Sequence, residues 1–221
     1  MPLRETIKRA VERVTGIGLP SRKEARSRTR KSKPVTIRFE DDGSVPNNPM
    51  LPFVHYRGAA DLKGAADPAA VFEQLFEANG WGDSWRNGIY DYVHYHPRTH
   101  EVLGVARGSA RVQFGGEGGK VVKLTAGDVA ILPAGTGHEA LSATKDLLVI
   151  GAYPPDGEYE EFEGSATEHA RALGMIPKVP VPKADPVYGR DGPLMALWRP
   201  KKRTDGSAVR RPNRRKRRAR N

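Results

Sequence analysis

Two short segments of this chain, each holding histidines and glycines at fixed spacings, limit its fold more than any other feature. The first segment has the pattern G-x5-H-x-H-x4-E-x6-G, and the second has the pattern G-x5-P-x-G-x2-H. The side chains with metal-binding chemistry are His94, His96, Glu101 and His138. Imidazole nitrogens and carboxylate oxygens together suit Fe, Mn, Ni, Co or Zn, and the spacing does not choose among these ions. The sequence therefore predicts one site for a divalent transition metal.

Both segments are also predicted to be β-structure. Aromatic and β-branched residues are dense from residue 90 to residue 96, which favours a strand. Side chains alternate between the two faces of a strand, so His94 and His96 point to one side while Tyr95 points to the other. A returning strand then begins at Glu101, which brings the carboxylate near the two imidazoles. A proline- and glycine-rich turn before the last histidine is expected to direct its imidazole inward.

Three further side chains are candidates for proton transfer. Tyr90 and Tyr92 share strand parity with the metal-binding histidines, so their hydroxyl groups either line the same cavity or pack inward as ordinary core. His100 is the third candidate, but it alternates with Glu101, which directs it elsewhere and favours a place on the turn surface. Catalytic roles for Tyr90, Tyr92 and His100 are therefore hypotheses that depend on where these side chains lie.

Other polar and aromatic residues near the first segment have two interpretations each. Arg86 and Arg98 either bind a substrate carboxylate or phosphate through paired hydrogen bonds, or are solvated at the surface. Trp81 and Trp85 are expected in a loop, where they form a lid or cover the end of the barrel. The Gly115–Gly119 segment is interpreted as a hairpin connection, because it lacks the Lys-Ser/Thr ending of a phosphate-binding loop.

The two patterns together resemble the signature motifs of the cupin superfamily. The residues at the structural positions of those motifs are Gly88, Gly108, Gly127, Pro133 and Gly135. By this resemblance, the three histidines and the glutamate of the predicted metal site match the three-His, one-Glu ligand set of cupins. One position departs from the pattern, since Ser142 stands where the second motif usually ends in Asn.

A narrower resemblance is to the YjlB-like cupins, and it covers residues 35–198. The segments that carry it are Asp41–Gly43, Pro46–Pro49, His94–His96, Leu132–His138, Gly151–Pro155 and Asp185–Gly189. The resemblance implies an all-β fold, the cupin-type double-stranded β-helix or jelly-roll barrel, with a few peripheral helices. It also implies a divalent metal and a small-molecule substrate or ligand. The function is then that of a metal-dependent enzyme of oxygenase, isomerase or lyase type on a small polar metabolite, or of a non-catalytic metal-dependent sensor; a homodimer also fits the family.

Local sequence predicts the remaining elements. Strands are expected at residues 35–39, 51–56, 110–114, 121–124, 128–132 and 147–153, and helices at 69–79 and 165–173. Asp67 is the expected cap of the first helix, whose buried face is formed by the apolar residues at positions 71, 72, 75 and 76. Pro52 either begins the second strand or places it at a sheet edge.

Charge divides the chain into three parts. Residues 1–34 hold 11 Lys and Arg against 3 acids, and residues 199–221 hold 12 against one, whereas residues 35–198 hold 14 against 22. We therefore predict a basic N-terminal arm at 1–34, a cupin barrel at 35–198 and a disordered basic tail at 199–221. Apolar residues recur at helical spacing from Leu3 to Val14, so the arm is expected to contain an amphipathic helix that docks on the body, with a membrane-surface helix as the alternative.

Composition bounds the partners and the location. The basic tail is expected to attract polyanions without sequence specificity, which makes a nucleic-acid-associated role a third functional hypothesis; the tail equally fits a segment with no selected role. The chain has no cysteine, which excludes disulfides and thiolate ligands. It lacks an apolar run of signal-peptide or membrane-spanning type, so a cytoplasmic location is expected, or a nuclear one in a eukaryotic cell.

Overall fold

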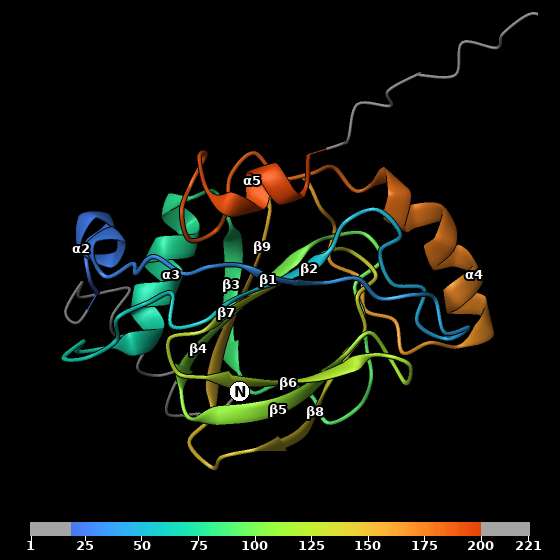
Figure 1. The fold of residues 1–221 in the computed structure, drawn as a ribbon, viewed down its shortest axis with the longest axis horizontal. Coiled ribbons are helices and arrows are strands. Elements are labelled where there is room, and N and C mark those ends of the chain that lie inside the picture. Colours follow the sequence, from blue (N-terminus) through green and yellow to red (C-terminus); the bar gives the residue numbers. More distant parts are fainter. Residues whose placement is uncertain (1–18, 200–221) are drawn as a thin grey trace, which may run out of the picture.

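The structure is a computed structural model that describes residues 19–199. Its strands form two antiparallel sheets packed face to face (Figure 1). The strands are β1 (Val35–Ile37), β2 (Phe53–Tyr56), β3 (Gly82–Asn87), β4 (Glu101–Arg107), β5 (Ser109–Phe114), β6 (Lys120–Thr125), β7 (Val129–Leu132), β8 (His138–Ala143) and β9 (Leu148–Tyr153). The larger sheet has the order β1-β2-β7-β4-β9-β3, and the smaller has the order β6-β5-β8. This arrangement confirms the predicted all-β barrel.

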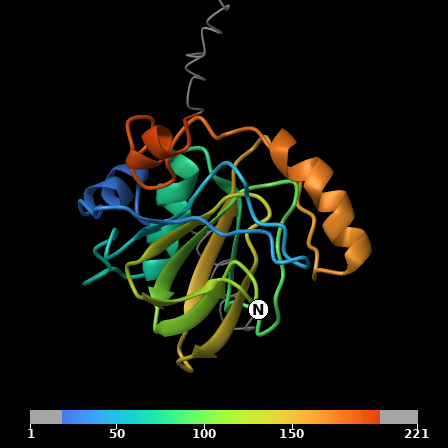
Figure 2. The same cartoon turned by 45° about the vertical axis from the view of Figure 1, so that its right-hand side comes forward.

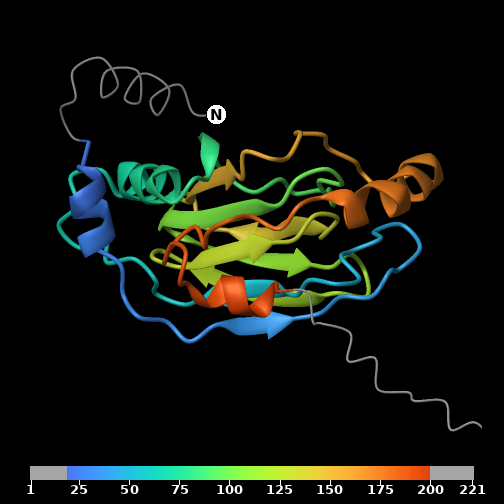
Figure 3. The ribbon, with the colours of Figure 1, turned by 90° about the horizontal axis from the view of Figure 1, so that it is seen from above.

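A few helices surround the barrel, as expected. They are α2 (Arg22–Ser27), α3 (Pro68–Ala78), α4 (Ala166–Met175), the short 3-10 helix η1 (Ile176–Lys178) and α5 (Pro193–Leu197). α3 and α4 flank opposite sides of the barrel (Figures 1 and 2). From the end of α4, a proline-rich strap runs across the molecule to α5 (Figure 3). Within residues 19–199, none of the helices is long and apolar enough to span a bilayer.

The core has two layers, one on each face of the larger sheet. Val102 of β4 belongs to the outer layer, together with Phe72 of α3. Its neighbour Leu103 belongs to the inner layer, which includes Phe114 of the smaller sheet. Successive side chains of a strand point to opposite faces, so a strand buried on both faces has a continuous run of apolar residues. β4 is therefore packed on both sides, and Glu101 is its first residue.

The two predicted helices form where the sequence places them. Asp67 caps α3 by accepting a hydrogen bond from the Ala69 amide at 2.9 Å, and proline at the first helical position favours this start. The predicted apolar face of α3 is buried. Ser165 caps α4, and its side chain accepts a hydrogen bond from the Glu168 amide. Capping chemistry predicted the start of α3, whereas the Ser165 cap of α4 is a finding of the structure.

Most predicted strands are confirmed to within a few residues of their ends. β2 begins directly after Pro52, which confirms the strand-start interpretation of this proline. The edge interpretation is wrong, because β2 lies between β1 and β7. The Gly115–Gly119 segment connects β5 to β6, as the hairpin interpretation predicts.

Two local predictions are wrong. The expected strand at residues 90–96 is a loop that makes only isolated bridges, His94 with His138 and Tyr95 with Phe162. Its backbone bonds reach two different parts of the chain, so no continuous ladder forms. Trp85, expected in a loop, lies in β3, which pairs with β9. The small and polar residues of β3 hide its strand character, because pairing with a neighbour outweighs local propensity.

The N-terminal arm is described from residue 19 onward. Its helix α2 packs on α3, where Arg26 donates from Nη2 to the Ala78 carbonyl at 2.9 Å. The predicted amphipathic helix from Leu3 to Val14 lies outside the described residues, as does the predicted tail beyond Arg199. The three-part division of the chain stays a prediction.

Gly104 of β4 faces the ring of Phe72, and we expect its replacement by alanine to destabilise the protein. An added Cβ would lie 2.7 Å from Phe72 Cδ1, so α3 and β4 must move apart, at a cost of about 1–3 kcal/mol. Gly174→Ala is the control, because an added Cβ there has nothing within 4 Å and alanine is the better helix former. Urea denaturation measures both variants. A Gly104→Ala variant as stable as the wild type would show that this contact is not tight.

Candidate metal centre

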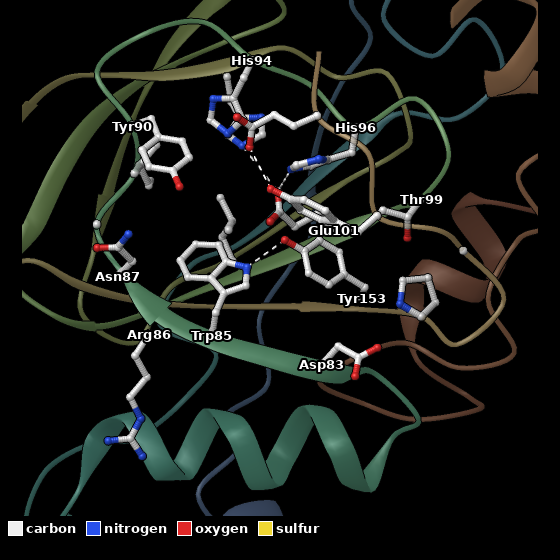
Figure 4. A pocket seen from close by; sticks show the side chains of 18 residues that line it. Asp83, Trp85, Arg86, Asn87, Tyr90, His94, His96, Thr99, Glu101 and Tyr153 are labelled. Atoms are coloured by element: carbon white, nitrogen blue, oxygen red, sulfur yellow. Dashed lines mark hydrogen bonds and ion pairs between the residues drawn. The ribbon is translucent and has the colours of Figure 1, made fainter. Parts of the chain in front are cut away.

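Three buried imidazoles meet inside the barrel. One potential ligand atom from each of His94, His96 and His138 lies within 4.8 Å of the other two (Figure 4). His138 begins β8, and its backbone exchanges two hydrogen bonds with His94, at 3.2 Å and 2.9 Å. This pair of bonds joins the two motifs of the sequence. The predicted common direction of His94 and His96 is confirmed, since Tyr95 between them packs into a separate apolar cluster.

Each imidazole is oriented by a backbone carbonyl. The Nδ1 atoms and their carbonyl partners are His94 with Tyr92 O at 3.3 Å, His96 with Glu160 O at 3.0 Å, and His138 with Thr136 O at 3.2 Å. A ring that donates its Nδ1 proton to a carbonyl carries its lone pair on Nε2. Hydrogen bonds of this kind set the tautomer of metal-ligating histidines in proteins. The three rings are therefore arranged as neutral donors toward a common point.

Glu101 lies next to two of the three imidazoles. Its Oε2 lies 3.5 Å from His96 Nε2 and 3.4 Å from His138 Nε2, and this oxygen is buried without a hydrogen-bond partner. Burial raises the pKa of Glu101 to about 7, against the lowering effects of the His94 charge and the Tyr153 hydrogen bond. An unpartnered carboxylate oxygen in the interior is costly unless a cation compensates it. The donor set fits one divalent metal.

The histidines are held in the form that binds metal. Burial is the largest cause that lowers the pKa of His94 and of His96. Burial also lowers the pKa of His138 well below its usual value, and the charges of His94 and His96 add to this effect. Neutral imidazole is the ligand form, so near pH 7 no proton has to leave these rings before a metal binds.

A cavity of about 480 Å³ opens beside the four residues. Its walls come from β3, from the loop that follows β3, and from the end of β9 and the loop after it. The main side chains are Asp83, Trp85, Tyr90, Tyr153, Tyr159 and Glu161. Trp85 donates from Nε1 to the Tyr153 hydroxyl at 2.8 Å (Figure 4), and Tyr153 is hydrogen-bonded to Glu101. The cavity is large enough for a small molecule that reaches the histidines.

The proposed proton-transfer residues lie in different places. Tyr90 lines the cavity. Tyr92 stacks on Tyr90 with ring centroids 4.9 Å apart, and the Tyr92 hydroxyl donates to Glu161 at 3.2 Å. These two residues therefore belong to the cavity and its edge.

His100 lies outside the cavity, and its expected place on the turn surface is wrong. It is fully buried, with its ring 4.7 Å from that of Trp198. Its Nδ1 accepts a hydrogen bond from the Ala134 amide at 2.9 Å, and burial lowers its pKa to about 3. His100 points away from Glu101, as the alternation predicts. Because β4 is packed on both faces, this direction leads into the protein interior and not to the surface.

Neither interpretation of Arg86 holds. This residue of β3 is fully buried, and its guanidinium points away from the histidines toward α3 (Figure 4). Its Nη1 donates to Asp67 at 2.8 Å and its Nη2 donates to Glu73 at 2.7 Å. Arg98 matches the surface interpretation, since it is half-exposed and pairs with Glu158. Arg86 therefore has a structural role and does not bind substrate.

Three residues of the cavity were missed in the sequence. Tyr153, Tyr159 and Glu161 follow the metal motifs at a distance and belong to no spacing pattern. Tyr153 ends a predicted strand and belongs to a segment that carries the narrower family resemblance. Tyr159 and Glu161 also share parity, as side chains on one face of an extended segment do.

The chain matches known proteins over the part that holds this site. Residues 87–150 match the family model described as Cupin domain. The uncharacterized protein YjlB of Bacillus subtilis (strain 168) is 39% identical over 163 residues, which make up 74% of this chain and 95% of that protein.

Solved structures match smaller parts. A Bacillus subtilis oxalate decarboxylase is 20% identical, and the match covers 51% of this chain and 22% of the decarboxylase chain, with a TM-score of 0.29. The TDP-fucose-3,4-ketoisomerase WlaRA from Campylobacter jejuni is 11% identical, and the match covers 41% of this chain and 73% of that chain, with a TM-score of 0.33. The family model spans the histidine cluster, and YjlB is matched over nearly its whole length. On these grounds this chain belongs to the cupin family and groups there with YjlB.

Proposed function

We propose that this protein is a metal-dependent enzyme that acts on a small polar metabolite. His94, His96, Glu101 and His138 would hold one divalent transition metal, Fe, Mn, Ni, Co or Zn. The observation that carries the proposal is the buried, unpartnered Oε2 of Glu101, which faces the His96 and His138 nitrogens. A bound metal would supply Lewis acidity toward a substrate oxygen, or activate water or dioxygen, as oxygenases, isomerases and lyases require.

The chain's own residues would bind the substrate and position the carboxylate. Tyr153 orients Glu101, and Trp85 in turn orients Tyr153 through the hydrogen bond at 2.8 Å. Tyr90 has its ring in the cavity wall and can hold a proton on its hydroxyl beside a bound molecule. Tyr92 would act through Glu161, with which it shares a hydrogen bond. His100 would contribute only by supporting the fold around the site, since it lies outside the cavity.

A metal-dependent binding module is the second candidate, and the tyrosines favour it. Burial is the main cause that raises the pKa of Tyr153 and of Tyr159. Burial and the charge of Glu161 likewise raise the pKa of Tyr92, to about 12. Phenols that keep their protons are weak bases at neutral pH, and they serve better as fixed hydrogen-bond donors. Polyanion binding by the arms remains a third hypothesis, and it rests on residues mostly outside the described part of the chain.

The first test is the metal content of protein purified without a metal-affinity column. Inductively coupled plasma mass spectrometry is expected to find about one equivalent of a single transition metal per chain, because the four proposed ligands form one site. Turnover with a panel of small polar metabolites would support the enzyme, whereas thermal stabilisation by a metabolite without turnover would support the binding module. A wild-type protein that contains no metal and takes up none of the five ions would overturn both.

A further inference from the structure

The cavity beside the histidines is acidic. Three of its side chains are carboxylic acids, Asp83, Glu101 and Glu161, and they outnumber the two charges of a divalent metal. Besides the three histidines, Arg86 is the one basic residue among the described residues that line it, and its guanidinium donates to two carboxylates under α3. The cavity therefore offers no cationic side chain that could receive an anionic group, and its potential favours a positive one.

Two exposed aromatic rings line the cavity at its entrance, and a third stacks on one of them. Tyr90 and Tyr159 are 43% and 60% exposed, and Tyr92, which stacks on Tyr90, is 38% exposed. The hydroxyls of Tyr92 and Tyr159 both donate to Glu161, at 3.2 Å and 2.8 Å. These bonds place the Glu161 carboxylate at the hydroxyl ends of two exposed rings. A carboxylate next to exposed aromatic rings offers an organic cation both a counter-charge and a ring face.

Several hydrogen-bond donors in and beside the cavity are already engaged. Tyr92 and Tyr159 use their protons on Glu161, and the Trp85 N–H is used on Tyr153. Tyr153 in turn is hydrogen-bonded to Glu101. An anionic group entering here would meet few donors and would face carboxylates, a combination that costs affinity.

We propose that the molecule taken up by this cavity carries a positively charged nitrogen, as an amine or a quaternary ammonium group. The cationic group lies among Tyr90, Tyr92, Tyr159 and Glu161, and the polar remainder points toward the histidines. This assignment rests on the proposed function, since it names the substrate class of the same site.

A matched set of probes tests the charge preference. Choline, its uncharged carbon isostere 3,3-dimethylbutan-1-ol and the anion 3-hydroxypropanoate are titrated by calorimetry into wild-type protein of measured metal content. Choline is expected to bind about tenfold more tightly than either of the others, because cation–π contacts and the Glu161 charge act on the cation alone. Equal or tighter binding of the neutral or anionic probe, or binding of none of the three, would overturn the proposal.

Two variants locate the preference. Glu161→Gln keeps the size of the side chain and is expected to weaken choline about tenfold while leaving the neutral isostere unchanged. Tyr159→Leu removes an exposed ring and is expected to act in the same direction without unfolding the protein. Glu117→Gln, in the exposed hairpin between β5 and β6, is the control and should bind as the wild type does. A Glu161→Gln variant that keeps the wild-type preference would overturn the assignment. Metal in the same sample with no preference for choline defeats this inference alone, whereas a sample that takes up no metal defeats the proposed function.

Discussion

Replacing His94 and His138 together by alanine is expected to abolish metal binding. The backbones of His94 and His138 exchange the two hydrogen bonds that join the two motifs. The double variant removes two of the four proposed metal ligands. Loss of an outer-shell partner alone typically lowers metal affinity by about 10–100-fold. Loss of two ligands should exceed that, and the bound metal should fall below about one tenth of the wild-type amount. Metal analysis of the two proteins, prepared identically, measures the effect.

The matched control for this variant is His169→Ala. His169 bonds to Asp41 through Nε2 at 2.8 Å and lies in α4, outside the cavity. The His169→Ala variant also replaces a histidine by alanine, and its metal content should stay at the wild-type level. Circular dichroism of the double variant is expected to show the wild-type β-signal. Retention of a full equivalent by a folded double variant would place the metal elsewhere.

Arg86→Met is expected to be the most destabilising single change in the described part of the chain that we can name. The guanidinium is fully buried between Asp67 and Glu73. Burial by itself lowers the pKa of Arg86, but the Glu73 hydrogen bond and charge, with the charge of Asp67, raise it above the usual value. Removing the cation leaves two buried carboxylates without their partner, which costs about 3–5 kcal/mol. Urea denaturation monitored by tryptophan fluorescence measures the loss.

Two further variants separate charge from packing. The triple variant Asp67→Asn, Glu73→Gln, Arg86→Met removes all three charges of this cluster, and much of the lost stability should return. Arg98→Met removes an arginine from a half-exposed ion pair, and there the cost should stay below about 1 kcal/mol. An Arg86→Met variant no less stable than Arg98→Met would mean that the buried pairs contribute little.

The histidine cluster that could hold a metal was the most predictable part of this protein. His94 and His96 are two residues apart, so any extended backbone places them on one side, whether or not a strand forms. The prediction of their common direction is therefore correct, although the segment predicted as a strand is a loop. Glu101 was equally predictable because β4 follows directly. The glycines and prolines that shape the turns act locally, so the motifs retain their meaning without knowledge of the rest of the chain.

The walls of the cavity could not be predicted in the same way. Glu161 reaches the entrance because residues after β9 return alongside the loop of Tyr95, through the bridge to Phe162. The role of Arg86 depends on α3, a helix that precedes it but packs beneath its strand. Both relations are set by the tertiary arrangement, and a single sequence carries no local signal for them. For the same reason His100 was placed on the surface.

The four proposed metal ligands come from both sheets and from the loop before β4. Glu101 starts β4 of the larger sheet and His138 starts β8 of the smaller one, yet their side chains are 3.4 Å apart. An ion bound by both residues would link the two sheets inside the barrel. Release of the ion and separation of the sheets would then be thermodynamically coupled. Loss of the proposed metal is therefore expected to weaken the contact between the sheets and to make the protein easier to degrade.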